Sequence, residues 1–162
     1  MHIRTYDARD WPAVWAIVEP IIRAGDTFCY DPAQSEDEAR DLWVVPPPGH
    51  VVVAADDDRI VGTSNMYPNR PGPGSHIASG NLMVAAAARG RGVGRALGEH
   101  LIGWAREHGF GGVQFNAVAA SNEPAVALYE RLGFTIVGTV PRAFRHPTLG
   151  DVGLHVMFHD LG

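Results

Sequence analysis

Three glycines at alternate positions, Gly90, Gly92 and Gly94, separate a segment with strand-like alternation from a segment with helical spacing. The strand is expected to end near Val84, and the apolar residues that follow at helical spacing are Val93, Leu97, Leu101, Trp104 and Ala105. Glycine lets the backbone turn tightly and present its N–H groups to an anion, and a helix N-terminus adds about half a positive charge at the same point. The segment therefore predicts a strand, an anion-binding loop and a helix, in that order.

Arg89, Arg91 and Arg95 add three cations to this loop, which suits a phosphate or a pyrophosphate. No Lys-Ser/Thr pair follows the glycines, so the loop is not a nucleotide P-loop, and the glycine spacing matches the dinucleotide fingerprint poorly. The alternative from these residues alone is a glycine-rich connection with incidental arginines.

The rest of the chain alternates between short strands and helices with no internal repeat. We expect strands at about 2–6, 51–55, 60–66, 76–84, 113–118, 135–140 and 152–158, and helices at about 10–24, 35–43, 92–108 and 122–132. Pro20 is expected to kink or interrupt the first helix, and Ser35 with Glu38 has the spacing of a capping box. This order predicts one mixed α/β domain over residues 1–162, with a mostly antiparallel sheet flanked by about four helices.

Charge and composition exclude several functional classes. A formal net charge of -5 argues against nucleic-acid binding, and no window approaches the ~20 apolar residues of a membrane span. The N-terminus lacks the apolar run of a signal peptide, so we expect a cytoplasmic protein with no membrane attachment. Cys29 is the only cysteine, and the eight histidines show no metal-binding spacing, so we expect neither a disulfide nor a metal site.

Three segments together resemble the GCN5-related N-acetyltransferase (GNAT) superfamily. They are Arg89-x-x-Gly92-x-Gly94, the preceding Leu82-Met83-Val84, and Ser121 to Phe134, which matches the second signature of the superfamily almost position by position. The resemblance implies the GNAT fold, acetyl-coenzyme A as cofactor, and direct acetyl transfer to an amine within a ternary complex. It identifies the anion of the glycine loop as the pyrophosphate of coenzyme A.

The resemblance also assigns roles to individual residues. It implies cofactor contacts from Leu82, Met83, Val84, Arg89, Gly90, Arg91, Gly92, Val93, Gly94, Arg95, Asn122 and Tyr129. The backbone N–H of Val84 or a neighbour would polarise the thioester carbonyl, and Tyr129 would protonate the leaving sulfur. Tyr129 and Asn122 are thus the catalytic candidates. Their structural alternatives are packing of one helix face by Tyr129 and capping of the following helix by Asn122.

A narrower likeness, to azetidine-2-carboxylate acetyltransferases, implies an amino or imino acid as the acceptor. It is carried by segments 25–28, 114–116 and 138–141 and by the strand around His76, and it implies substrate contacts from Asn81, Asn116 and Ser79, which stands at the usual asparagine position of the subgroup. The GNAT fold places the loop with Thr27 and Tyr30 at the acceptor site, and the alternative for this loop is packing on the core. Subgroup members are commonly homodimers. The competing functions are acetylation of a xenobiotic amine, as in phosphinothricin acetyltransferases, and non-catalytic binding of acyl-coenzyme A.

The general base is not identified by the sequence. No Asp or Glu occurs between Met66 and Ala88, where many GNAT relatives carry a glutamate. The proton must therefore leave through water held by polar side chains, through His76, or from an amine that is already neutral. Cys29 is expected to serve packing, and Arg142, Arg145 and His146 to be solvated charges unless they bind a substrate carboxylate.

Overall fold

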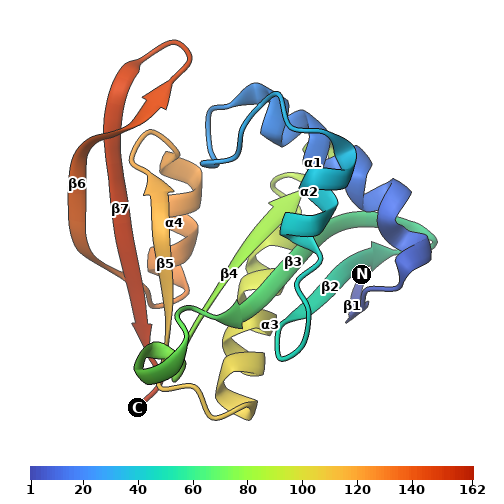
Figure 1. The fold of residues 1–162 in the computed structure, drawn as a ribbon. Helices are drawn as coiled ribbons and strands as arrows, with labels where there is room; N and C mark the ends of the chain where they lie inside the picture. The colour runs from blue at the N-terminus through green and yellow to red at the C-terminus, as the bar shows by residue number, and fades with distance from the viewer.

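The computed structural model describes all 162 residues and contains one seven-stranded sheet in the order β1-β2-β3-β4-β5-β7-β6 (Figure 1). The strands are β1 His2–Thr5, β2 His50–Asp56, β3 Arg59–Pro68, β4 Ile77–Val84, β5 Gly112–Ala119, β6 Thr135–His146 and β7 Gly150–Asp160. The α-helices are α1 Trp11–Ala24, α2 Glu36–Trp43, α3 Val93–Glu107 and α4 Glu123–Arg131. This is the mixed α/β domain that the sequence predicts, with four α-helices and one parallel strand pair.

Strand alternation divides the apolar residues between the two faces of the sheet. Val51 and Val53 of β2 pack with α1 and α2, whereas Val52 and Ala54 pack on the opposite face with α3. Because successive strand residues point to opposite faces, one run of valine and alanine contributes to both cores. The helices therefore cover the central strands from both sides.

The parallel pair of β4 and β5 is short, and this creates an opening in the middle of the sheet. The two strands are in register only at Ile77 with Gly112 and at Ala78 with Val113. Beyond these pairs they diverge, as Figure 1 shows, so the later residues of β4 have no strand partner on the β5 side. Backbone groups along that edge must find partners other than the sheet.

Two local expectations from the sequence are wrong. Pro20 does not interrupt α1, which is continuous from Trp11 to Ala24 and ends at Gly25 with φ of 63°. The last two strands are longer than their apolar runs suggested, because β6 and β7 continue as an exposed hairpin to His146 and from Gly150. The capping box at the start of α2 is confirmed: Glu38 N–H donates to Ser35 Oγ, and Ser35 N–H donates to the Glu38 carboxylate.

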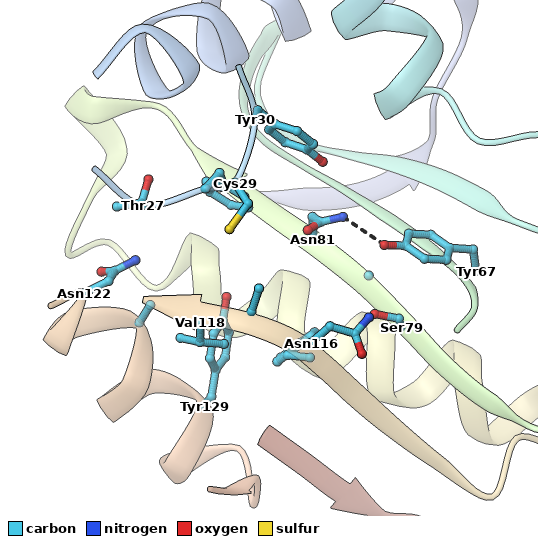
Figure 2. Close-up of a pocket in the computed structure, with 15 residues that line it drawn as sticks. Thr27, Cys29, Tyr30, Tyr67, Ser79, Asn81, Asn116, Val118, Asn122 and Tyr129 are labelled. Atoms are coloured by element: carbon cyan, nitrogen blue, oxygen red, sulfur yellow. Dashed lines mark hydrogen bonds between the residues drawn. The ribbon is translucent and has the colours of Figure 1, made fainter. Parts of the chain in front are cut away.

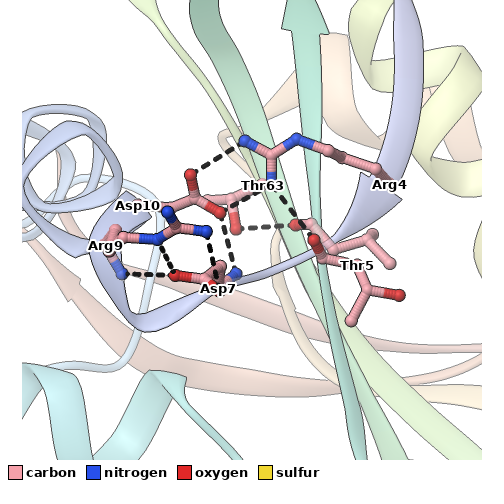
Figure 3. A network of polar contacts seen from close by, with 7 residues as sticks. Arg4, Thr5, Asp7, Arg9, Asp10 and Thr63 are labelled. Carbon is pink, nitrogen blue, oxygen red and sulfur yellow. Dashed lines mark hydrogen bonds and ion pairs between the residues drawn. The ribbon is translucent and has the colours of Figure 1, made fainter.

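Ion pairs fasten the N-terminal strand to the start of α1 (Figure 3). Arg4 donates two hydrogen bonds to the carboxylate of Asp10, at 2.7 and 2.8 Å, and Arg9 donates to Asp7 at 2.8 Å. These bonds lower the pKa of both Asp7 and Asp10.

None of the helices has the length and apolar character that a membrane crossing requires.

Candidate active site

A cavity of about 210 Å³ lies where β4 and β5 diverge, on the sheet face that α1 and α2 cover (Figure 2). Its walls come from the loop after α1, from β3, β4 and β5, and from α4. All five predicted substrate residues line it, together with both catalytic candidates: Thr27, Tyr30, Ser79, Asn81, Asn116, Asn122 and Tyr129. Residues from five separate segments therefore meet at one site.

The loop after α1 forms the outer wall of the pocket. The rings of Phe28 and Tyr30 stack at 5.8 Å with an interplanar angle of 3°. Arg23 of α1 donates to the backbone carbonyls of Pro32 and Gln34, which holds the loop against the helix. Burial raises the pKa of Tyr30, so its hydroxyl stays protonated and serves as a neutral hydrogen-bonding group.

Polar side chains on β3 and β4 form the floor of the pocket. Tyr67 is paired with Ser79 and Asn65 with Asn81, and directly opposed residues of an antiparallel pair share one face. Asn81 Nδ2 donates to Tyr67 Oη at 3.3 Å and to Asn65 Oδ1 at 2.9 Å. Asn81 Oδ1 and the Ser79 hydroxyl make no hydrogen bond within the protein, so both are available to a ligand.

Asn116 extends from an irregular part of β5. The register of β5 with β7 shifts between Phe115 and Val118, and Asn116 lies in this bulge, with its side chain extending toward Ser79 of β4 in Figure 2. Its Nδ2 donates to Asn69 Oδ1 at 2.6 Å, and its Oδ1 accepts from Gln114 at 2.9 Å. One amide proton of Asn116 remains free to contact a ligand.

Tyr129 is held by aromatic neighbours and directs its hydroxyl into the pocket (Figure 2). Its ring lies 4.6 Å from Phe115 and 5.9 Å from Phe134, measured between centroids. The hydroxyl makes no hydrogen bond within the protein, and burial raises the pKa of Tyr129 to about 12. Packing thus fixes the ring, and the hydroxyl is a proton donor at neutral pH.

Asn122 occupies the N-cap position of α4 but does not cap it with its side chain. Its backbone carbonyl accepts from Ala125 and Val126 N–H, both at 3.1 Å, while its side chain lines the pocket. The capping interpretation of this side chain is therefore wrong, and its amide is free to bind a ligand.

The glycine loop forms an open cradle before α3. Gly90 and Gly92 have φ of 74° and 81°, and a Cβ at either position would meet no atom within 4 Å. Gly92 is the N-cap of α3 and no side chain caps it, so the first N–H groups of the helix lack a protein acceptor. An anion such as a pyrophosphate satisfies these donors without displacing any part of the protein.

The other residues of this segment contribute unequally. Arg91 is paired with Asp56 at 2.6 Å and Arg95 with Glu99 at 2.8 Å, which leaves Arg89 as the unpaired cation. The side chain of Val93 is buried in the core, and a Cβ on Gly94 would lie 3.2 Å from Leu128, so Gly94 permits close packing of α3 on α4. Only the backbone of these two residues can face a cofactor.

Backbone groups on the free edge of β4 provide the second part of a cofactor site. Asn69 N–H donates to the carbonyl of Ile77, and Ala85 N–H donates to Val61, so the odd-numbered residues of β4 direct their backbone groups toward β3. Leu82 and Val84 consequently direct theirs into the opening, whereas Met83 pairs with β3 and buries its side chain. An extended chain bound in the opening would pair with Leu82 and Val84 like an added strand.

The structure also locates His76, Cys29 and Arg145. His76 is exposed and does not line the pocket, and the lining contains no histidine and no carboxylate. Cys29 is exposed and lines the pocket instead of packing in the core. Arg145 pairs with Asp151 at 3.0 Å on the exposed hairpin, which agrees with the expectation of a surface charge. No group of histidine, cysteine or acidic side chains has a metal-binding arrangement.

Two residues of this site, Asn65 and Tyr67, escaped the sequence interpretation. The available signal was the alternation of Thr63, Asn65 and Tyr67 on β3, which places polar side chains on one face of an otherwise apolar strand. Their importance follows from the strand register, which sets Asn65 and Tyr67 opposite Asn81 and Ser79.

Comparison with known proteins gives consistent matches. Residues 11–134 match the Acetyltransferase (GNAT) family. A GCN5-related N-acetyltransferase from Kribbella flavida is 52% identical, with a TM-score of 0.96 over 99% of this chain and 97% of that one. The N-acetyltransferase aca1 of Schizosaccharomyces pombe is 30% identical over 76% of this chain, and the match spans 66% of the length of that protein.

A phosphinothricin acetyltransferase from Sinorhizobium meliloti, solved in complex with acetyl-coenzyme A, shares the fold. Its TM-score is 0.88 over 99% of this chain and 88% of that one, at 21% sequence identity.

Proposed function

The chain belongs to the acetyltransferase (GNAT) family, whose acetyl donor is acetyl-coenzyme A, and we propose that its acceptor is the amine of a small molecule. The observation that carries this proposal is the uncharged cavity of about 210 Å³ between the free edge of β4 and Tyr129. Taking ~30 Å³ for one water in the liquid, this corresponds to roughly seven waters. The space suits a small acceptor better than a folded protein surface.

The cofactor would lie along the free edge of β4 and the glycine loop. Bound acetyl-coenzyme A supplies the acetyl group as an activated thioester. The uncapped N–H groups at the start of α3, with Arg89, would hold its pyrophosphate, and the backbone groups of Leu82 and Val84 would pair with the pantetheine arm. A backbone N–H of this edge is also placed to donate to the thioester oxygen.

Transfer forms an N–C bond and breaks a C–S bond, so the amine must lose a proton and the sulfur must gain one. Tyr129 is the donor on the sulfur side, because its raised pKa keeps its hydroxyl protonated. No carboxylate or histidine lines the pocket, so water held by the Ser79 hydroxyl and Asn116 would take the amine proton. The uncharged lining assists this step, since it disfavours the ammonium form of the acceptor.

Two acceptor classes are in contention. Amino or imino acids are favoured by the likeness to azetidine-2-carboxylate acetyltransferases, and the five predicted substrate residues all line the cavity. Xenobiotic amines are suggested by the phosphinothricin acetyltransferase that shares the fold. Both classes present an amine on a compact body, in keeping with the cavity volume.

The test is to follow coenzyme A release from acetyl-coenzyme A with imino acids, amino acids and amine antibiotics, including L-azetidine-2-carboxylate and L-phosphinothricin. Acetylation of at least one small amine, confirmed by mass spectrometry of the product, is expected. If the protein binds acetyl-coenzyme A in calorimetry but acetylates no amine, the alternative of a non-catalytic binding module replaces this proposal.

A further inference from the structure

Asn65 is fully buried on the central strand β3 and lies directly behind the pocket without lining it. Its Nδ2 donates to the carbonyl of Trp43, the last residue of α2, at 3.0 Å. Its Oδ1 accepts twice from Asn81, from the backbone N–H at 3.0 Å and from Nδ2 at 2.9 Å. One buried amide therefore links α2, β3 and the floor of the pocket.

This arrangement determines which way the Asn81 amide points. The carbonyl of Trp43 can only accept, so it requires the Nδ2 end of Asn65 and leaves Asn65 Oδ1 facing β4. An acceptor facing Asn81 requires the Nδ2 end of Asn81 in turn. The second proton of that Nδ2 goes to Tyr67 Oη, which leaves Asn81 Oδ1 with no partner in the protein.

The free Asn81 oxygen faces away from Tyr67 and into the pocket, as Figure 2 shows. Flipping the amide would set its oxygen against Asn65 Oδ1, which loses the 2.9 Å hydrogen bond between the two amides and leaves two acceptors in contact, whereas the Tyr67 hydroxyl could pair with either end. We propose that Asn65 is a positioning residue, which orients the Asn81 amide so that its oxygen accepts an N–H of the incoming amine. This inference rests on the proposed function, because it assigns Asn81 a role toward the acceptor of that reaction.

A hydrogen bond from the amine to Asn81 Oδ1 would fix the direction of the nitrogen lone pair. Orientation of a nucleophile is sensitive to small errors, and a shift of about 1 Å can lower the rate about 10²-fold. Removing the Asn65 amide is therefore expected to lower kcat/KM for the acceptor. The cofactor site, which is formed by the start of α3 and the free edge of β4 at Leu82 and Val84, should stay unchanged.

Asn65→Leu removes both functions of the amide, and Thr63→Val is its matched control. Thr63 is equally buried on the same strand and bonds the same tryptophan, since its hydroxyl accepts from Trp43 Nε1 at 3.1 Å, but it makes no hydrogen bond with Asn81. With L-azetidine-2-carboxylate and L-phosphinothricin as acceptors, Asn65→Leu should lower kcat/KM for the acceptor about 10²-fold and leave KM for acetyl-coenzyme A unchanged. Thr63→Val should change kcat/KM less than about threefold.

A double-mutant cycle separates positioning from general damage. If Asn65 acts through Asn81, then adding Asn65→Leu to Asn81→Ala should cause no further loss of kcat/KM. A further loss equal to that of Asn65→Leu alone would overturn the proposal, as would equal losses in Asn65→Leu and Thr63→Val.

A second variant and a second readout cover failure of Asn65→Leu to fold. A buried carboxyl in Asn65→Asp takes up a proton, donates to Trp43 and accepts from Asn81, so kcat/KM should stay within about tenfold of the wild type. A loss as large as that of Asn81→Ala in folded protein would contradict the proposal.

Nitrogen-15 NMR reports the Asn81 side-chain amide directly, without any acceptor. Slow proton exchange of Asn81 Nδ2 is expected in the wild type and in Asn65→Asp. Fast exchange in the wild type would contradict the proposal that Asn65 holds the Asn81 amide in one orientation. Because this readout needs no turnover, it still tests the role of Asn65 if no amine in the panel is acetylated and the proposed function itself fails.

Discussion

Replacing Tyr129 with phenylalanine should lower turnover without lowering stability. The ring contacts with Phe115 and Phe134 remain, and the hydroxyl that is removed makes no hydrogen bond within the protein. The hydroxyl opens into the pocket, where water can solvate it, so its removal should change the free energy of unfolding by no more than roughly 1 kcal/mol. For a chain of this length that corresponds to at most about 2–4 °C in Tm.

Tyr129→Phe should lower the turnover number much more than it changes the free energy of unfolding. A positioned proton donor contributes about 10²–10⁴-fold to the rate, so kcat should fall by at least about 10²-fold, or about 2.7 kcal/mol in the barrier. Affinity for acetyl-coenzyme A, measured by calorimetry, should stay nearly constant because the cradle before α3 and the free edge of β4 are untouched.

Tyr6→Phe is the matched control for this experiment. The Tyr6 hydroxyl likewise makes no hydrogen bond within the protein, but it is buried after β1 and lies outside the pocket. Tyr6→Phe should reproduce the small change in stability with kcat unaltered. If Tyr129→Phe retains kcat within about threefold, or if both variants lose activity equally, then Tyr129 is not the proton donor.

Three further substitutions test the cradle, the start of α4 and the N-terminal ion pairs. Gly92→Ala forces a side chain into the left-handed region at φ of 81°, which costs about 1–2 kcal/mol. The variant should bind acetyl-coenzyme A more weakly in calorimetry, and the loss in binding free energy should exceed the loss in stability that the fall in Tm reports. Asn122→Ala should cost well under the ~1 kcal/mol of a lost cap in urea unfolding, since its side chain makes no capping bond. The hydrogen bonds from Arg4 lower the pKa of Asp10, so their contribution to stability is present above the pKa of Asp10 in the unfolded chain and is lost as the pH falls through its pKa in the folded protein. Asp10→Asn should therefore flatten the decline of the urea midpoint below about pH 4. Equal acid sensitivity of Asp10→Asn and the wild type would show that this ion pair does not contribute.

Sequence patterns predicted the elements well where one residue type dominates a local choice. A run of valine and alanine specified β2, the capping box specified the start of α2, and the glycines specified the turn before α3. The family and acetyl-coenzyme A as its cofactor were predicted from the resemblance carried by the glycine loop, Leu82-Met83-Val84 and Ser121 to Phe134, and they are confirmed by the comparisons. Pro20 misled because packing of α1 on the sheet outweighs one missing backbone hydrogen bond.

The site was harder to predict because it depends on pairing between strands. Ser79 and Asn81 stood out by alternation within β4, but Asn65 and Tyr67 matter only because the register sets them opposite those two residues. The positions of His76 and Cys29 relative to the pocket, and the ion pair between Arg91 and Asp56, likewise depend on contacts between distant segments. Local patterns carry no information about such contacts.

The two residue pairs that join β4 to β5 also have a mechanical consequence. Strands β1 to β4 form one continuous hydrogen-bonded ladder, and β5, β7 and β6 form another, so only the pairs of Ile77 with Gly112 and Ala78 with Val113 join the two ladders. Beneath the opening the apolar core is shared, because Leu82 of β4 and Phe115 of β5 belong to one cluster with Leu101 of α3. Across the opening, the two halves of the sheet are therefore held together by side-chain packing and not by backbone hydrogen bonds.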